Sequence, residues 1–174
     1  FAAKLGPFKS LEELKADVKR EVAERKQQQA DNDYIDELLG KITEASKVSI
    51  PDVLIDEQVE RMVADRKQNI IYRGQTWKEF LELQQMTEEQ YRKSLRADAE
   101  LRVKAGLVLS AISEAEDITL TDNELNSHIT HLKAQYTDQE MRAQLAKPEN
   151  RREIASRMVT QKTIATLTQY ATAK

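Results

Sequence analysis

A long helix is predicted by the stretch TEEQYRKSLRADAELRVKAGLVLSAI, residues 87–112. Thr87 and Gln90 have the spacing of a capping box, in which two side chains satisfy each other's free backbone N–H groups at a helix start. The stretch opens charged and becomes apolar on nearly every face at residues 105–112. Because a helix that is apolar all round packs against several neighbours, we expect this part at the centre of the protein, with Gly106 allowing a close approach.

Other helices are predicted outside this stretch by apolar periodicity and by further capping boxes. From Leu11 onward, apolar residues recur at spacings of three and four, and the pattern continues through a polar segment at 23–33 that contains no Gly or Pro. A helix that is polar on all sides is typical of a solvent-crossing strut. Further helices are predicted over residues 51–73, from 77 to about 84, from 121 to about 136, and after 148–150. The remaining capping boxes are Ser10/Glu13, Thr76/Glu79, Thr121/Glu124 and Thr137/Glu140.

Composition favours an all-α fold. The 174 residues include 27 basic and 30 acidic side chains, 4 Gly and 3 Pro, and 5% are aromatic. A β-sandwich or barrel needs turn residues every ~8–12 positions, which this chain does not supply. The formal net charge is only −3, so the concentrated basic excess of a nucleic-acid-binding protein is missing. We expect an elongated multi-helix domain of long antiparallel helical hairpins.

Several classes of protein are excluded by what the sequence lacks. Without cysteine there are no disulfides, thiolate metal sites or Cys nucleophiles. No stretch approaches the ~20 apolar residues that span a bilayer, so we expect no membrane association. The first residues, FAAKLG, contain neither an initiator Met nor the apolar core of a signal peptide. We therefore expect the chain to be a piece of a longer protein.

Residue patterns for catalysis or metal binding are weak. His128 and His131 lie three residues apart on one predicted helix, a spacing that could bring two imidazoles to one metal ion, but two histidines on a solvated face are the favoured interpretation. A di-iron bundle requires Glu three residues before His, and Leu125 stands there. The abundant carboxylates fit a solvated helix surface, and the glycines are isolated. We expect no catalytic residues, no metal and no cofactor.

A cluster of apolar residues surrounds one predicted hairpin tip and is called the tip cluster below. One interpretation is that its members pack against each other as a satellite core. The other is that they form an exposed patch that binds unfolded chains, because Met and aromatic side chains adapt to varied partners. On the second interpretation the candidate client-binding residues are Met62, Val63, Ile70, Ile71, Tyr72, Trp77, Phe80, Leu81 and Met86.

Several segments of this sequence resemble the C-terminal domain of the trigger factor family. They occur in the family's order and span nearly the whole chain: FAAKLG (1–6), FKSLEELKADV (8–18), SIPDVLID (49–56), VKAGLVL (103–109) and ITLTDNEL (118–125). The resemblance implies a junction at residues 1–9 after an isomerase domain, followed by a helical chaperone domain at 10–174. It also implies a body and two helical arms that hold clients in a cradle between them.

The resemblance further implies a bacterial, cytoplasmic, ATP-independent chaperone that meets nascent chains near the ribosome and assists folding, export and cell division. The ribosome-binding part and the FKBP-like prolyl isomerase (rotamase) domain precede this region in the family. We therefore expect no enzymatic activity in this chain, even though the parent protein would be a ribosome-associated peptidyl-prolyl cis-trans isomerase. Expected partners are unfolded or nascent polypeptides, the ribosome only through the absent N-terminal domain, and no nucleic acid directly. Weak self-association is an additional expectation.

Two other functions fit the same residues. A periplasmic SurA-type chaperone module would have a similar helical fold and would bind outer-membrane proteins. A helical adaptor would recognise one folded partner and ignore denatured proteins. The full-length sequence would distinguish the first alternative, and a choice between folded and denatured partners would distinguish the second.

Overall fold

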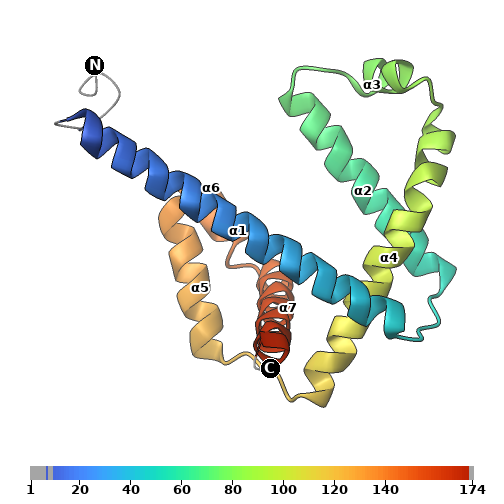
Figure 1. Cartoon of the computed structure of the whole chain (residues 1–174). Helices are drawn as coiled ribbons and strands as arrows, with labels where there is room; N and C mark the ends of the chain where they lie inside the picture. The colour runs from blue at the N-terminus through green and yellow to red at the C-terminus, as the bar shows by residue number, and fades with distance from the viewer. Residues whose placement is uncertain (1–6, 8–9, 173–174) are drawn as a thin grey trace. The chain divides into compact units, whose positions relative to one another are not determined.

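The computed structural model describes residue 7 and residues 10–172, and every regular element within them is a helix. The all-α prediction is confirmed. The predicted junction at 1–9 lies outside the described residues, apart from Pro7. Figure 1 shows the helices in chain order: α1 (Leu11–Ala45), α2 (Asp52–Tyr72), α3 (Trp77–Gln84), α4 (Glu88–Ala115), α5 (Asp122–Gln135), α6 (Gln139–Gln144) and α7 (Pro148–Thr172).

The chain divides into two compact units, residues 1–42 and residues 43–174. The described part of the first unit is the N-terminal portion of α1, which is continuous through the polar segment at 23–33 as predicted. No side chain between residues 10 and 42 is buried. Pairs one turn apart line the helix: Arg25 contacts Glu21 at 2.7 Å, and Lys41 contacts Glu37 at 2.6 Å. Pairs this exposed are screened by water and contribute little to helix stability.

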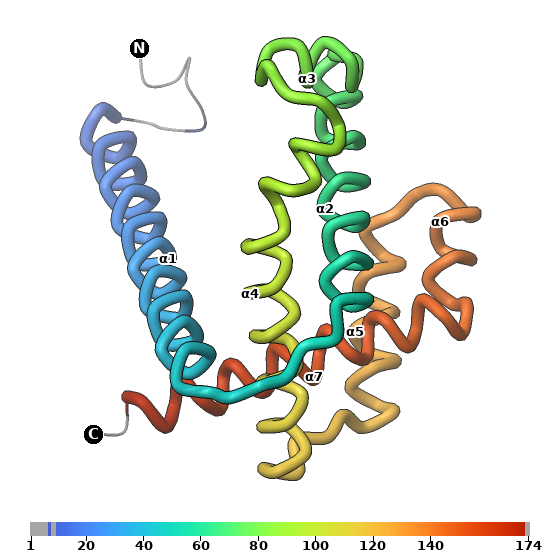
Figure 2. Tube along the Cα trace, turned by 90° about the vertical axis from the view of Figure 1, so that its right-hand side faces the viewer, coloured from blue at the N-terminus to red at the C-terminus, as the bar shows by residue number. Residues whose placement is uncertain are grey.

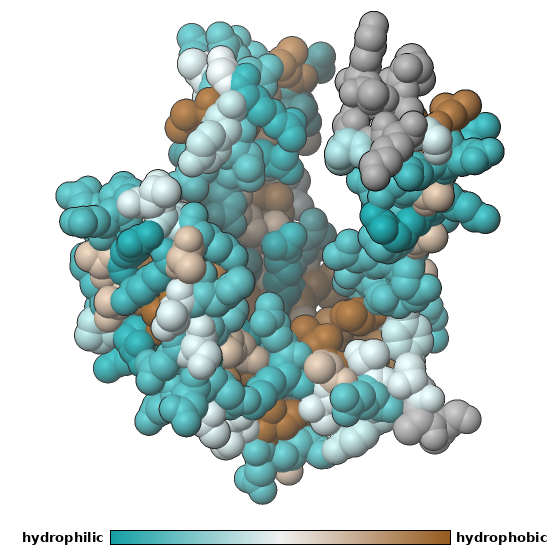
Figure 3. Space-filling model, turned by 90° about the vertical axis from the view of Figure 1, so that its left-hand side faces the viewer, coloured by the Kyte–Doolittle hydropathy of each residue, from teal (hydrophilic) through white to brown (hydrophobic). Residues whose placement is uncertain are grey.

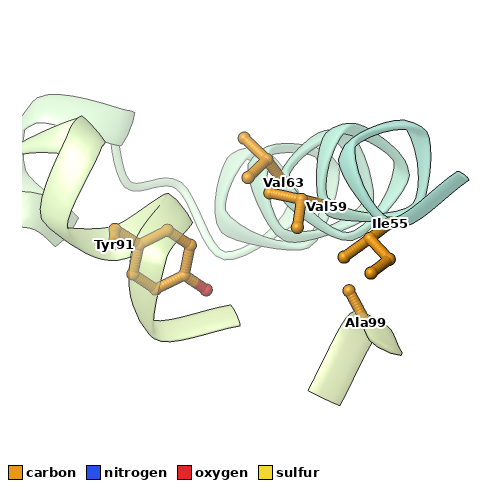
Figure 4. Packing of buried hydrophobic residues seen from close by; sticks show 5 residues of the cluster. All are labelled: Ile55, Val59, Val63, Tyr91 and Ala99. Carbon is orange, nitrogen blue, oxygen red and sulfur yellow. The ribbon is translucent and has the colours of Figure 1, made fainter. Parts of the chain in front are cut away.

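In the second unit, α2 and α4 run antiparallel, with α3 across one end of the pair (Figure 2). Apolar side chains repeat along the facing sides of the two helices and form the core of this hairpin. Figure 4 shows Ile55 of α2 directed at Ala99 of α4, which is fully buried. The buried members of this cluster are Ile55, Val59, Val63, Tyr91 and Ala99.

Charged side chains bridge α2 and α4 beside this core. Arg96 on α4 forms ion pairs with both Asp52 and Asp56 on α2, and Arg92 pairs with Glu60. The hydrogen bond from Arg96 to Asp56 is the largest of several contacts that raise the pKa of the Arg96 guanidinium. These ion pairs connect opposite charges on the two helices and so favour their observed register.

The other end of α4 contacts α7, which also contacts α5. Val108 and Leu109 are buried here, whereas Gly106 and Leu107 are exposed. A Cβ atom placed on Gly106 would meet no atom within 4 Å. The predicted close approach at Gly106 and the burial of residues 105–112 on every face are therefore wrong. The helix is covered on one side only, and its apolar excess stays at the surface.

Three of the predicted capping boxes are complete in the structure: Thr76/Glu79, Thr87/Gln90 and Thr121/Glu124. At the start of α1, the Ser10 hydroxyl accepts a hydrogen bond from the Glu13 backbone N–H at 3.1 Å. The Thr137/Glu140 box is wrong. Asp138 caps α6 instead, and its carboxylate accepts from the Glu140 backbone N–H at 2.8 Å.

Candidate functional site

The tip cluster lies at the end of the α2–α4 hairpin that carries α3, and its members differ in exposure. Val63 and Ile70 are buried, with 2% and 4% of their surface exposed. Ile71, Tyr72 and Met86 are exposed, by 69%, 88% and 40%. The remaining members are half-buried and pack against the hairpin core: Met62, Trp77, Phe80 and Leu81.

Aromatic rings hold α3 against the hairpin. Within α3, the rings of Trp77 and Phe80 are stacked, with centroids 5.3 Å apart. Tyr91 in the second turn of α4 meets both rings edge-on, with its centroid 5.3 Å from that of Trp77 and 5.5 Å from that of Phe80. Edge-to-face pairs add ~0.5–1.5 kcal/mol beyond their buried area. These contacts make α3 a cover over the end of the hairpin core.

Cations of α2 lie over the same rings. The Lys67 ammonium is 5.0 Å from the centroid of Trp77, and the Arg66 guanidinium is 5.9 Å from that of Phe80. Glu88 accepts hydrogen bonds at 3.1 Å from both the Lys67 ammonium and the Trp77 indole N–H. The hydrogen bond from Lys67, followed by that from Trp77, lowers the pKa of the Glu88 carboxyl. Thus one carboxylate connects α2, α3 and α4.

The sequence analysis missed one exposed apolar residue at this end of the hairpin, Leu83. Leu83 of α3 is 69% exposed. It falls off the stripe of Trp77, Phe80 and Leu81, which repeats at the i, i+3, i+4 spacing of a buried helix face. The signal for Leu83 in the sequence was that an apolar residue lies outside the buried stripe of its helix. Ile71 and Tyr72 are therefore exposed at the end of α2, and Leu83 is exposed on α3.

Other apolar side chains are exposed at separate places on the helices. They include Val18 and Val22 of α1 and Leu101 of α4. On the face shown in Figure 3, hydrophobic residues form separate patches among hydrophilic ones. Scattered patches of this kind are individually small, which keeps a surface from associating strongly with any one partner.

The two histidines lie on α5. His128 is half-buried, and the Nε2 atom of exposed His131 is 3.2 Å from the side-chain amide nitrogen of Gln135. Across residue 7 and residues 10–172, no group of three or more His, Cys, Asp or Glu side chains is placed to hold a metal ion. In the same part of the chain, no helix combines the length and apolar content needed to cross a membrane.

The described residues thus form an all-α domain that presents exposed apolar side chains at the end of a charged helical hairpin. The family described as "Bacterial trigger factor protein (TF) C-terminus" matches residues 10–169. This chain therefore belongs to the bacterial trigger factor family, a family of chaperones, and matches its C-terminal region.

Individual relatives agree with the family match. Trigger factor of Brevibacillus brevis is 35% identical over 136 residues, which cover 78% of this chain and 32% of the relative. Trigger factor of Caldicellulosiruptor saccharolyticus is 32% identical over 136 residues, covering 78% and 31%. Trigger factor of Macrococcus caseolyticus is 32% identical over 127 residues, covering 73% and 30%. The chain matches about a third of the length of these curated relatives. No solved structure matches it.

Proposed function

We propose that this chain binds unfolded or nascent polypeptides without ATP and prevents their aggregation, in the cytoplasm of a bacterium. The observation that carries the proposal is the exposure of Ile71 and Tyr72, consecutive large apolar residues at the end of α2. Leaving two neighbouring large apolar residues in water is unfavourable, and their exposure gives an unfolded chain an apolar surface to bind. The family match supports a chaperone role for this region.

Each contact with a client is weak in this proposal. Full burial of one large apolar side chain is worth about 1.5–3 kcal/mol, and the ordering of an unfolded segment removes part of that gain. Apolar residues at separate positions, such as Val22 and Leu101, give a client more than one place to bind. Several weak contacts on one chain add through effective concentration, while each can be released rapidly. This combination suits a chaperone that uses no ATP.

The cradle between two arms, isomerase activity and ribosome docking are separate proposals. They follow from the resemblance, and isomerase activity and ribosome docking are proposed for regions outside these residues. Because the chain matches about a third of the relatives' length, the activity of the whole protein is not assigned to this part. For the chain itself we propose client binding alone.

The experiment is light scattering of a chemically denatured client diluted into buffer with this chain and without ATP. We expect suppressed aggregation at near-stoichiometric amounts. The variant Ile71→Ser/Tyr72→Ser should lower client affinity by about 5- to 30-fold, which corresponds to roughly 1–2 kcal/mol. Circular dichroism should show unchanged helicity, since neither side chain is buried.

The matched control is Val53→Ser at the opposite end of α2, where the valine is 59% exposed. It removes a similarly exposed apolar side chain without touching the tip cluster, so the control should suppress aggregation nearly as well as the unchanged chain. Equal affinity in the Ile71/Tyr72 variant and the unchanged chain would remove these residues from the binding surface. Failure of the folded, unchanged chain to suppress aggregation would favour an adaptor with one folded partner.

A further inference from the structure

We propose that α3 is an internal ligand: it occupies a second polypeptide-binding site on the α2–α4 hairpin, and client segments of similar sequence compete for that site. The inference deepens the proposed function, on which it rests, by naming a covered site beside the exposed one. The segment class is given by α3 itself, WKEFLELQ, with aromatic residues at the first and fourth positions and Leu at the fifth.

The backbone of α3 is hydrogen-bonded mostly within its own segment; just before it, the Gln75 backbone N–H donates to the Ile70 carbonyl of α2 at 3.2 Å. At its start, Thr76 and Glu79 complete a capping box. At its end, the backbone N–H of Met86 donates to the Leu81 carbonyl at 3.1 Å. The following helix, α4, has its own complete capping box at Thr87. Unpaired backbone groups are costly, and the two capping boxes keep the first N–H groups of α3 and α4 paired when α3 moves.

The segments that join α3 to its neighbours have backbone conformations suited to hinges. Gly74 before α3 has a φ of 73°, and Gln85 after it has a φ of 53°. Both values lie in the left-handed region, which glycine adopts readily and glutamine rarely does. A change of φ at these two residues would move α3 as a unit, because hinges are commonly a few residues at element ends that absorb the backbone change. The change would break the two backbone hydrogen bonds that span the hinges, from Gln75 to Ile70 and from Met86 to Leu81.

The contacts that seat α3 are side-chain contacts at a partly open surface. No residue of α3 is buried. The contacts of α3 are the rings against Tyr91, the cations of α2 over those rings, the hydrogen bond from Trp77 to Glu88, and the packing of its apolar side chains on the hairpin core. The side chains of Lys67 and Glu88 are 37% and 40% exposed, so water competes for this part of the hold. A helix seated in this way can exchange with a competing segment.

The surface beneath α3 is suited to aromatic side chains. Tyr91 is only 8% exposed and presents its ring to two aromatic neighbours. Arg66 and Lys67 place positive charge over the faces of those neighbours, which favours aromatic rings over aliphatic groups at the same positions. A client segment with two aromatic residues three positions apart would make the same contacts. The α2–α4 hairpin therefore selects aromatic-rich segments when α3 is displaced.

The test uses a synthetic peptide of residues 75–86 and the full 174-residue chain carrying Trp77→Ala/Phe80→Ala. If Trp77 and Phe80 contact clients directly, this variant binds more weakly than the unchanged chain. If they seat an internal ligand, the vacated site accepts the Trp and Phe of the peptide. Apparent affinity scales with the fraction of open sites, so we expect the variant to bind at least ~10-fold more tightly. Trp77 is the single tryptophan of the chain, so peptide fluorescence reports binding to the variant without background.

Two controls accompany this variant. A peptide with both aromatic residues replaced by Ala should not bind. The protein control is Lys78→Ala/Glu82→Ala, which changes an exposed pair on α3 at 3.8 Å and should bind the peptide as weakly as the unchanged chain. Measured by circular dichroism, the helicity of each variant is compared with that of the unchanged chain before binding is interpreted.

Glu88→Gln keeps the proposal testable if the double variant fails to fold. It removes the ion pair with Lys67 but leaves a side-chain oxygen for the Trp77 indole, so peptide affinity should rise by about 3-fold because the open state is more populated. The proposal is overturned if the folded Trp77→Ala/Phe80→Ala variant binds the peptide no more tightly than the unchanged chain. If that variant does not fold, the same result with Glu88→Gln overturns it. Failure of the proposed function is distinguishable, because aggregation of a denatured client is measured separately and without this peptide.

Discussion

Lys162 on α7 donates a hydrogen bond to Glu124 on α5 at 2.6 Å, and the same carboxylate completes the capping box of α5 with Thr121. The Lys162 ammonium also donates to the Thr119 carbonyl at 3.1 Å. One lysine therefore ties α7 to both the connector before α5 and its first turn. The contact joins residues 38 positions apart and gives this part of the fold a defined dependence on pH.

The carboxyl of Glu124 has its pKa lowered to about 2 from 4.5, first by the hydrogen bond from Lys162 and then by those within the capping box. A group whose pKa is lower in the folded state stabilises the fold above its unfolded pKa. The contribution is therefore complete above pH 4.5 and is lost as the pH falls from there toward about 2.

We expect Glu124→Gln to flatten the pH dependence of stability in that acidic window. Urea unfolding of the variant and the unchanged chain, compared at about pH 6 and about pH 3, measures the difference. The unchanged chain should lose more stability between the two values than the variant does. Lys162→Met, which removes the largest cause of the lowered pKa, should flatten the dependence in the same direction. Parallel pH profiles for all three proteins would show that this carboxylate does not couple folding to pH.

The corrected cap of α6 gives a second prediction. Thr87 caps α4 with its hydroxyl, which accepts from the Gln90 backbone N–H at 3.2 Å, so Thr87→Ala should cost about 1 kcal/mol of unfolding free energy. Thr137 does not cap α6, because Asp138 does. Thr137→Ala should therefore change stability by less than about 0.5 kcal/mol. Chemical denaturation measures both, and equal costs would mean that Thr137 also caps a helix in solution.

The hairpin core gives a third prediction from two residues of the same helix. Ile55 is 5% exposed and faces Ala99, whereas Val53 is 59% exposed. Ile55→Ala leaves a cavity in the core and should cost about 2–4 kcal/mol. Val53→Ala should stay within about 0.5 kcal/mol of the unchanged chain, since the valine is largely in water already. The midpoints of urea unfolding give the comparison. A small effect at Ile55 would indicate that the two helices close the cavity by moving together.

Much of the local structure was predictable from sequence. The polar segment of α1 contains no Gly or Pro and is helical as expected, and the capping boxes at Thr76, Thr87 and Thr121 are formed. These signals act over three or four residues, so the local chain carries the information they need. The box at Thr137 failed because a neighbouring Asp is an equally good cap, and spacing alone does not choose between them.

The candidate site was predictable only in part. The sequence placed its apolar residues together at a hairpin end, but periodicity did not separate Ile70, which is buried, from Ile71 and Tyr72, which are exposed. It also missed Leu83. Which side of a helix faces a neighbour depends on residues far away in the chain, and α3 meets α4 through Tyr91, whose ring contacts the sequence does not encode locally.

The sequence by itself determined that this protein is helical, where most helices begin, and which family it resembles, because caps, apolar periodicity and family motifs are local patterns. The tertiary structure decided which apolar residues are buried and which remain at the surface. It seated Trp77 on Tyr91 and left Tyr72 in water, and it covered Leu109 but not Leu107. Burial is set by contacts between helices rather than within them, so it follows from packing.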